Sequence, residues 1–131
     1  MPAIVPVVLV VEDRPGVRHL LEVALTQEGL RVVAVGDADD ALAAAVAMPP
    51  DLVLLDLLLP GNPSASFLRA LRQLPSGAET PVIVLSGLDG GLAASRAAGA
   101  QDFIAKPFDL RDLLQRVRQQ LAARRMPGTP A

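Results

Sequence analysis

The sequence contains no cysteine, no tryptophan and no tyrosine, and His19 is its only histidine. Without cysteine, the chain can form neither a disulfide framework nor a thiolate metal site. The lack of cysteine also fits a reducing compartment. These absences exclude disulfide scaffolds and zinc modules that are built on cysteine.

The sequence also lacks an excess of basic residues and any long apolar run. Lys and Arg number 12 against 14 Asp and Glu, which predicts no direct nucleic-acid partner because DNA phosphates attract a surplus of positive charge. No uninterrupted apolar run approaches the roughly 20 residues of a membrane helix. The apolar N-terminus has no basic start, so it does not read as a signal peptide. We therefore expect a cytoplasmic protein with no membrane partner.

The composition that remains is that of one folded domain. Of the 131 residues, 51% are hydrophobic and 20% are charged. A chain of this length can bury a core without disulfides. We expect residues 1–125 to form the domain, and residues 126–131 to be a tail or the start of a linker.

Short apolar runs alternate with helical patterns along the chain. The predicted strands are residues 7–11, 32–35, 52–55, 82–85 and 103–105. The predicted helices run from Pro15 to just before Gly29, from the N-cap Asp37 to Met48, over residues 65–74 and 92–98, and from Asp109 onward. Continuous apolar strands that alternate with helices predict an α/β fold, with a parallel sheet covered on both faces.

Apolar residues at helical spacing mark the faces of two helices that should meet the sheet. In the first helix these residues are Val17, Leu20, Leu21, Ala24 and Leu25. In the last helix we expect burial of Leu110, Leu113, Leu114, Val117 and Leu121.

Polar residues follow four of the five predicted strands. Glu12 and Asp13 follow the first strand, Asp56 the third, Ser86 the fourth and Lys106 the fifth. The carboxyl ends of parallel strands form one rim, where ligands bind beside the topological switch point. Residues far apart in the sequence should therefore meet in one cleft.

The charges of these residues point to a metal ion. Three carboxylates near one ammonium group repel one another, so a cation must bind or a carboxylate must have a raised pKa, offset in part by Lys106. Ligands that are all oxygen suit Mg²⁺ or Mn²⁺. A carboxylate nucleophile, a dication, a lysine and a hydroxyl group together are the equipment for phosphoryl transfer.

Four stretches together resemble a response-regulator receiver domain. They are residues 12–13, 54–61, 85–87 and 103–108, which read ED, LLDLLLPG, LSG and FIAKPF. The resemblance covers the chain from Val7 to about Arg124. It implies a single-domain, doubly wound, flavodoxin-like sheet of five parallel strands in the order 2-1-3-4-5.

The resemblance also implies roles in phosphoryl chemistry. Asp56 would accept the phosphoryl group from a phosphohistidine of a histidine kinase or phosphotransfer protein. Asp13 would ligate Mg²⁺ (or Mn²⁺) together with Asp56. Glu12 would hold the ion directly or through water, and Leu58 would contribute its backbone carbonyl.

A second set of residues would act as the switch. The resemblance implies that Ser86 binds a phosphoryl oxygen and moves on activation, while Phe103 turns inward. Lys106 would pair with Asp56 and then with the phosphoryl group, and its bond to Pro107 is expected to be cis. The implied partners on the output side are a downstream effector protein or output domain, and the resemblance allows a phosphorylation-dependent dimer.

Two segments depart from the family pattern. After the nucleophile, Asn62-Pro63-Ser64 stands where Asp-Gly is usual, which should stiffen that loop or change its turn. The segment from Ser86 to Gly99 is short and contains two adjacent glycines, which weaken the start of the fourth helix. The shape of the face formed by the fourth helix, fifth strand and fifth helix is therefore open.

Each residue alone has an ordinary structural explanation. Asp56 could be a strand-end aspartate, and Ser86 a plain loop serine. We expect the receiver to act as a signalling switch and not as an enzyme. Two other functions are alternatives to this interpretation. One is a degenerate receiver that acts only as a protein-interaction module. The other is a haloacid-dehalogenase-like phosphatase, but its nucleophile normally follows the first strand in an Asp-x-Asp pattern, and position 58 is leucine.

Overall fold

The computed structural model describes residues 5–56, 64–86 and 99–125. The strands are β1 (Val7–Val11), β2 (Arg31–Val35), β3 (Leu52–Asp56), β4 (Val82–Ser86) and β5 (Asp102–Ala105). The helices are α1 (Pro15–Gln27), α2 (Ala38–Ala47), α3 (Ser64–Gln73) and α5 (Leu110–Arg125), with a 3₁₀ turn, η1, at Pro75–Gly77. The helix predicted over residues 92–98 and the tail predicted from residue 126 lie outside the described residues.

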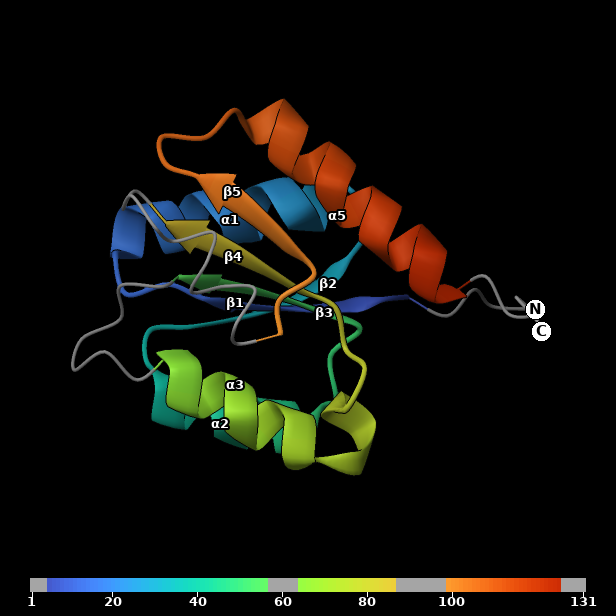
Figure 1. The fold of residues 1–131 in the computed structure, drawn as a ribbon. Helices are drawn as coiled ribbons and strands as arrows, with labels where there is room; N and C mark the ends of the chain where they lie inside the picture. Colours follow the sequence, from blue (N-terminus) through green and yellow to red (C-terminus); the bar gives the residue numbers. More distant parts are fainter. Residues whose placement is uncertain (1–4, 57–63, 87–98, 126–131) are drawn as a thin grey trace.

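The five strands form one parallel sheet in the order β2-β1-β3-β4-β5. This confirms the predicted doubly wound arrangement, because the strand order reverses direction at β1. Helices α1 and α5 cover one face of the sheet, and α2 and α3 cover the other (Figure 1). In the part of the chain that is described, no helix has the length and apolar character to cross a bilayer.

Alternate residues of each central strand enter two separate cores. In β1, Val8 and Val10 pack toward α1 and α5, while Leu9 and Val11 pack toward α2 and α3. The strands β3 and β4 divide their side chains in the same way. Since both faces are covered, these strands need apolar residues at every position, and this is why they read as continuous apolar runs in the sequence.

The predicted helix signals agree with the structure except at particular residues. The Asp37 side chain accepts a hydrogen bond from the Asp40 amide at 2.7 Å, which confirms it as the N-cap of α2. Leu20, however, is 47% exposed, so it does not belong to the buried face of α1. Leu110 and Leu114 are only partly buried, whereas the other three predicted core residues of α5 are fully buried. The 3₁₀ turn at Pro75–Gly77 was not predicted.

Arg72 connects the end of α3 to the segment that leads into β5. Its guanidinium donates hydrogen bonds to the carbonyl oxygens of Gly77, Thr80 and Gly99 and to Oε1 of Gln101. Partial burial lowers the pKa of Arg72. These bonds hold the amino ends of β4 and β5 against α3, at the opposite end of the sheet from the carboxyl rim.

We predict that Gly77→Ala destabilises the fold. A Cβ atom at Gly77 would overlap the Leu71 carbonyl oxygen and lie 2.9 Å from the Leu71 Cδ1 atom. Backbone cannot move away cheaply, so the free energy of unfolding should fall by about 1–3 kcal/mol. Urea denaturation followed by far-UV circular dichroism measures this change.

The matched control is Gly16→Ala in α1, where a Cβ atom would meet nothing within 4 Å. This variant should be as stable as the wild type, or more stable by about 0.5–1 kcal/mol, because alanine favours helix over glycine. Equal stability of Gly77→Ala and Gly16→Ala would contradict the packing described at Gly77.

Candidate functional site

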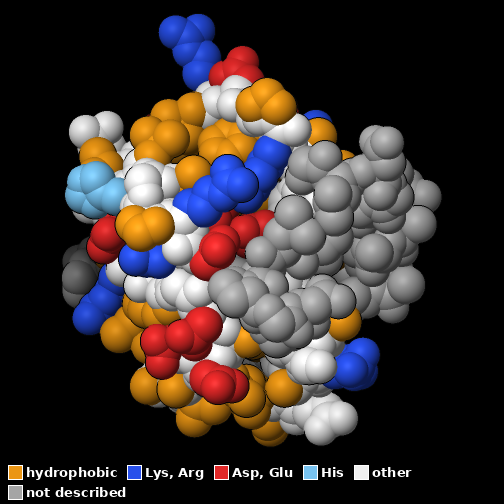
Figure 2. Space-filling model, turned by 90° about the vertical axis from the view of Figure 1, so that its left-hand side faces the viewer, with side chains coloured by type: hydrophobic (Ala, Val, Ile, Leu, Met, Phe, Trp, Pro, Cys, Tyr) orange, Lys and Arg blue, Asp and Glu red, His pale blue; other side chains and the backbone are white. Residues whose placement is uncertain are grey.

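The carboxyl ends of the strands bring the predicted polar residues together at one edge of the sheet. Asp56 is the last residue of β3 and pairs in register with Leu85, and Ser86 ends β4 next to Ala105 of β5. On this side of the molecule, acidic and basic side chains lie next to one another beside hydrophobic side chains (Figure 2). The fold therefore gathers residues from four separate strands.

Three carboxylates form the centre of this edge. One oxygen from each of Glu12, Asp13 and Asp56 lies within 4.8 Å of the others. Glu12 and Asp56 are buried, and Asp13 is half-buried. A group of three carboxylate oxygens without nitrogen or sulfur suits a hard divalent cation such as Mg²⁺ or Mn²⁺. The donor set thus fits the predicted metal.

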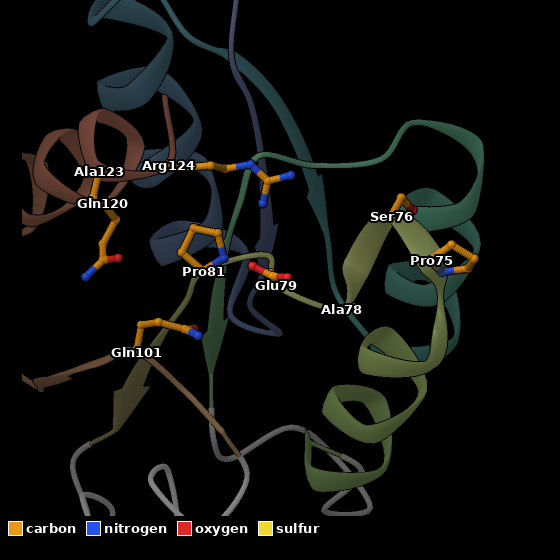
Figure 3. A pocket seen from close by; sticks show the side chains of 9 residues that line it. All are labelled: Pro75, Ser76, Ala78, Glu79, Pro81, Gln101, Gln120, Ala123 and Arg124. Carbon is orange, nitrogen blue, oxygen red and sulfur yellow. The ribbon is translucent and has the colours of Figure 1, made fainter. Parts of the chain in front are cut away.

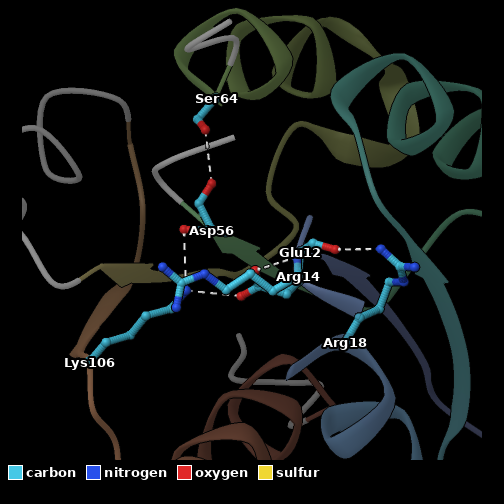
Figure 4. Close-up of polar contacts among 6 residues, drawn as sticks. All are labelled: Glu12, Arg14, Arg18, Asp56, Ser64 and Lys106. Atoms are coloured by element: carbon cyan, nitrogen blue, oxygen red, sulfur yellow. Dashed lines mark hydrogen bonds and ion pairs between the residues drawn. The ribbon is translucent and has the colours of Figure 1, made fainter. Parts of the chain in front are cut away.

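Lys106 binds two of these carboxylates. Its Nζ atom lies 3.0 Å from Oε1 of Glu12 and 3.5 Å from Oδ1 of Asp56 (Figure 4). The contact with Asp56 was expected, but the shorter contact with Glu12 was not. The Lys106–Pro107 peptide bond is cis, as expected.

Burial dominates the electrostatics of Glu12. Its side chain is fully buried, and this desolvation raises the pKa of the Glu12 carboxyl group above its ordinary value. The hydrogen bonds from Lys106 and from the Arg14 backbone amide lower that pKa in part, and the nearby charge of Asp56 raises it further. A raised carboxylate pKa was expected from crowding of like charges, but burial is the larger cause.

Ser64 contacts Asp56 through a hydrogen bond that the sequence did not indicate. It is the first residue of α3, and its Oγ atom donates a 2.9 Å hydrogen bond to the backbone carbonyl of Asp56. The sequence offered only a weak signal, namely a serine directly before the helix predicted over residues 65–74. Ser64 thereby ties α3 to the end of β3.

The two predicted switch residues lie on neighbouring strands. Ser86 is buried at the end of β4. Phe103, in β5, is partly buried and packs against the core between the sheet and helices α2 and α3. Leu58, which was predicted to offer its carbonyl to the metal, lies outside the described residues.

A pocket of about 660 Å³ opens over this site. Asp13, Asp56 and Lys106 line one part of it. The apolar part is lined by Val17, Leu20, Pro107 and Phe108. The exposed Leu20 therefore borders the carboxylates, and an occupant of this pocket would meet both charge and apolar surface.

A second pocket, of about 640 Å³, lies at the other end of the sheet (Figure 3). Residues around η1 and the start of β4 form one side, and the end of α5 forms the other. Its lining contains Glu79, Gln101 and Arg124 but none of the predicted site residues.

Comparison with known proteins agrees with this arrangement. The chain is 39% identical over 126 residues to the KDP operon transcriptional regulatory protein KdpE of Escherichia coli. It is 36% identical over 126 residues to the DNA-binding response regulator MtrA of Mycolicibacterium smegmatis. Both matches cover 95% of the chain but only 54% and 53% of the relative, so the chain spans about half the length of these proteins.

A solved structure is similar over nearly its whole length. The receiver domain of the sensor histidine kinase PA1611 from Pseudomonas aeruginosa, which has a magnesium ion coordinated in its active-site cleft, superposes with a TM-score of 0.82 at 30% identity. The match covers 91% of this chain and 99% of that structure. Residues 8–118 match the family described as the response regulator receiver domain. Because this match covers most of the chain and includes all five strand-end residues of the site, the chain belongs to the response regulator receiver domain family.

Proposed function

We propose that the chain accepts a phosphoryl group on Asp56 in a reaction that needs a divalent cation. The observation that carries this proposal is the approach of three carboxylate oxygens to within 4.8 Å, with the Lys106 ammonium beside two of them. Receiver domains are signalling modules that take a phosphoryl group on an aspartate and bind Mg²⁺. Membership of this family also argues against the phosphatase alternative.

Asp56 and Lys106 have different roles in the phosphoryl transfer. An Oδ atom of Asp56 forms a bond to phosphorus while the bond from phosphorus to the donor's histidine nitrogen breaks, and the electron pair of that bond stays on the nitrogen. Lys106 contacts the new negative charge on the phosphoryl oxygens. The divalent cation would supply positive charge to the same oxygens and to the three carboxylates.

The remaining predicted residues bind the phosphoryl group or the metal ion, or change position after phosphorylation. The Ser86 hydroxyl donates a hydrogen bond to a phosphoryl oxygen and shifts toward it. Phe103 follows by turning inward, which changes the surface that partners bind. The Leu58 backbone carbonyl would join Glu12, Asp13 and Asp56 in holding the metal ion.

The donor of the phosphoryl group is a histidine kinase or a phosphotransfer protein. The 660 Å³ pocket offers a phosphohistidine a route to Asp56, and on this route the residues around that histidine meet the apolar side of the pocket. Leu20 is 47% exposed there, which favours a partner with apolar groups next to its histidine. On the output side, a downstream effector protein or output domain reads the changed surface, with or without dimer formation.

The first test of this function is covalent modification. After incubation with acetyl phosphate and Mg²⁺, intact-mass measurement should show one added phosphoryl group in the wild type and none in Asp56→Asn. The matched control is Asp39→Asn, which removes an exposed carboxylate on α2 and should be modified like the wild type. Modification that persists in Asp56→Asn would contradict the assignment, and an unmodified wild type would favour a degenerate receiver that only binds partners.

We also predict that Asp56→Asn is more stable than the wild type when no metal is present. The change removes one of three crowded negative charges, and Lys106 keeps its shorter contact with Glu12. We expect the free energy of unfolding to rise by about 1–2 kcal/mol. This is below the roughly 4 kcal/mol by which two like charges 4 Å apart repel each other at an effective dielectric constant of about 20.

Thermal melting with and without Mg²⁺ at neutral pH tests this prediction. The wild type should gain more stability from Mg²⁺ than Asp56→Asn, since a ligand stabilises the state that binds it. If Asp56→Asn is clearly less stable than the wild type in EDTA, Asp56 serves mainly as a structural partner of Lys106.

The raised pKa of Glu12 predicts a pH dependence of stability. A carboxyl group whose pKa is higher in the folded state binds more protons there than in the unfolded chain. Its contribution to stability is full below the unfolded-state pKa and is lost as the pH rises through the folded-state pKa. In EDTA, the stability of the wild type relative to Glu12→Gln should therefore fall from about pH 4 upward. If the stability of the wild type minus that of Glu12→Gln stays constant or rises with pH, the pKa of Glu12 is not raised in the folded protein.

A further inference from the structure

The Arg18 side chain contacts the backbone next to the site and not its carboxylates. It lies in α1, and its Nη1 atom donates a 3.0 Å hydrogen bond to the backbone carbonyl of Glu12 (Figure 4). The Glu12 amide donates to the carbonyl of Val35 in β2, also at 3.0 Å. Both polar backbone groups of Glu12 are thus bonded, so the peptide unit that leads into Asp13 is held in one orientation.

Gly36 leaves the space that the Arg18 guanidinium occupies. A Cβ atom at Gly36 would lie 2.8 Å from Nη1 of Arg18 and 4.0 Å from the Glu12 carbonyl oxygen. The nearest obstacle is therefore the flexible end of one side chain. The chain accommodates the guanidinium by having no side chain at Gly36, the residue directly after β2.

Asp13 depends on this backbone more than Glu12 does. The Glu12 carboxylate is fixed by Lys106 and by the Arg14 amide. Within residues 5–56, 64–86 and 99–125, no hydrogen bond or ion pair holds the carboxylate of Asp13. Its position relative to Glu12 and Asp56 is consequently set by the peptide that Arg18 binds.

We propose that Arg18 is a positioning residue for the metal site. By bonding the Glu12 carbonyl it orients Asp13 toward the other two carboxylates before a cation binds. The inference rests on the proposed function, since it concerns the same metal site. A hydrogen bond with a charged donor is about twice as strong as a neutral one, so a guanidinium suits this task.

The positive charge of Arg18 has the opposite effect on a cation. If charge alone mattered, removing Arg18 would strengthen Mg²⁺ binding, because like charges repel. If Arg18 positions Asp13, removing it weakens Mg²⁺ binding. The direction of the change in the dissociation constant therefore separates the two effects.

The experiment measures the Mg²⁺ dissociation constant of the whole chain by NMR titration and calorimetry, since the sequence has no tryptophan or tyrosine. Arg18→Gln should raise the dissociation constant by about tenfold, the lower end of the range for residues that support metal ligands. Arg18→Lys keeps the positive charge and an N–H donor, so its Mg²⁺ dissociation constant should lie between those of the wild type and Arg18→Gln. Gly36→Ala displaces the guanidinium without removing its charge, so it should bind Mg²⁺ more weakly than the wild type. Arg69→Gln, an exposed arginine on α3, is the matched control and should bind like the wild type.

Thermal melting in EDTA shows that each variant is folded at the temperature of the titration. An unchanged or lowered dissociation constant in Arg18→Gln would overturn the inference. Should Arg18→Gln fail to fold, Gly36→Ala decides alone, and wild-type affinity in that variant overturns the inference equally.

Asp13→Ala distinguishes this outcome from failure of the proposed function. If Asp13→Ala binds Mg²⁺ as the wild type does, the metal site itself is wrongly assigned. If only Asp13→Ala loses affinity, the site stands and Arg18 has no part in it.

Discussion

The ion pair between Lys106 and Glu12 is the interaction on which the geometry of the site depends. The two residues are 94 positions apart in the sequence and follow the strands β5 and β1, which β3 and β4 separate in the sheet. The pair therefore reaches across the carboxyl edge of the sheet, with Asp56 of β3 beside it. Removing Lys106 would leave the fully buried Glu12 carboxylate without its ion-pair partner, which costs several kcal/mol. The ends of β1 and β5 are thereby held at the spacing that Asp56 needs.

Burial and charge crowding act on the same carboxylates, and burial has the larger effect at Glu12. The fully buried Glu12 side chain is disfavoured as an anion mainly because it has lost water, and only secondarily because Asp56 is near. Its hydrogen bonds from Lys106 and the Arg14 amide recover part of that loss. A bound dication would act on both causes at once, since it replaces water as a partner of the oxygens and also separates the negative charges. A bound cation would therefore lower the electrostatic cost of keeping these carboxylates ionised at the edge of the sheet.

Much of the fold could be predicted because the sequence patterns are local. Strands buried on both faces must be apolar at every position, so the runs at Val7–Val11 and Val82–Ser86 were recognisable to within one residue. The rim residues followed from the same logic, because parallel strands end together. The contacts of Lys106 with Glu12, of Ser64 with the Asp56 carbonyl and of Arg18 with the Glu12 carbonyl could not be predicted. Each depends on side-chain directions and on the exact approach of a helix to a strand end, which periodicity does not contain.

Lys106 contacts two carboxylates, Glu12 and Asp56, that have different roles in the proposed site. Its Nζ atom lies 3.0 Å from Glu12 and 3.5 Å from Asp56, so its closer partner is Glu12 and not the proposed phosphoacceptor. If Asp56 is phosphorylated as proposed, Lys106 can donate to the phosphoryl oxygens with its remaining N–H groups while one of them stays on Glu12. A lysine held by Asp56 alone would have to exchange its one partner when that carboxylate is modified, whereas Lys106 also has Glu12. Two acceptors at unequal distances would therefore let the proposed phosphoacceptor be modified while the Lys106–Glu12 ion pair is kept.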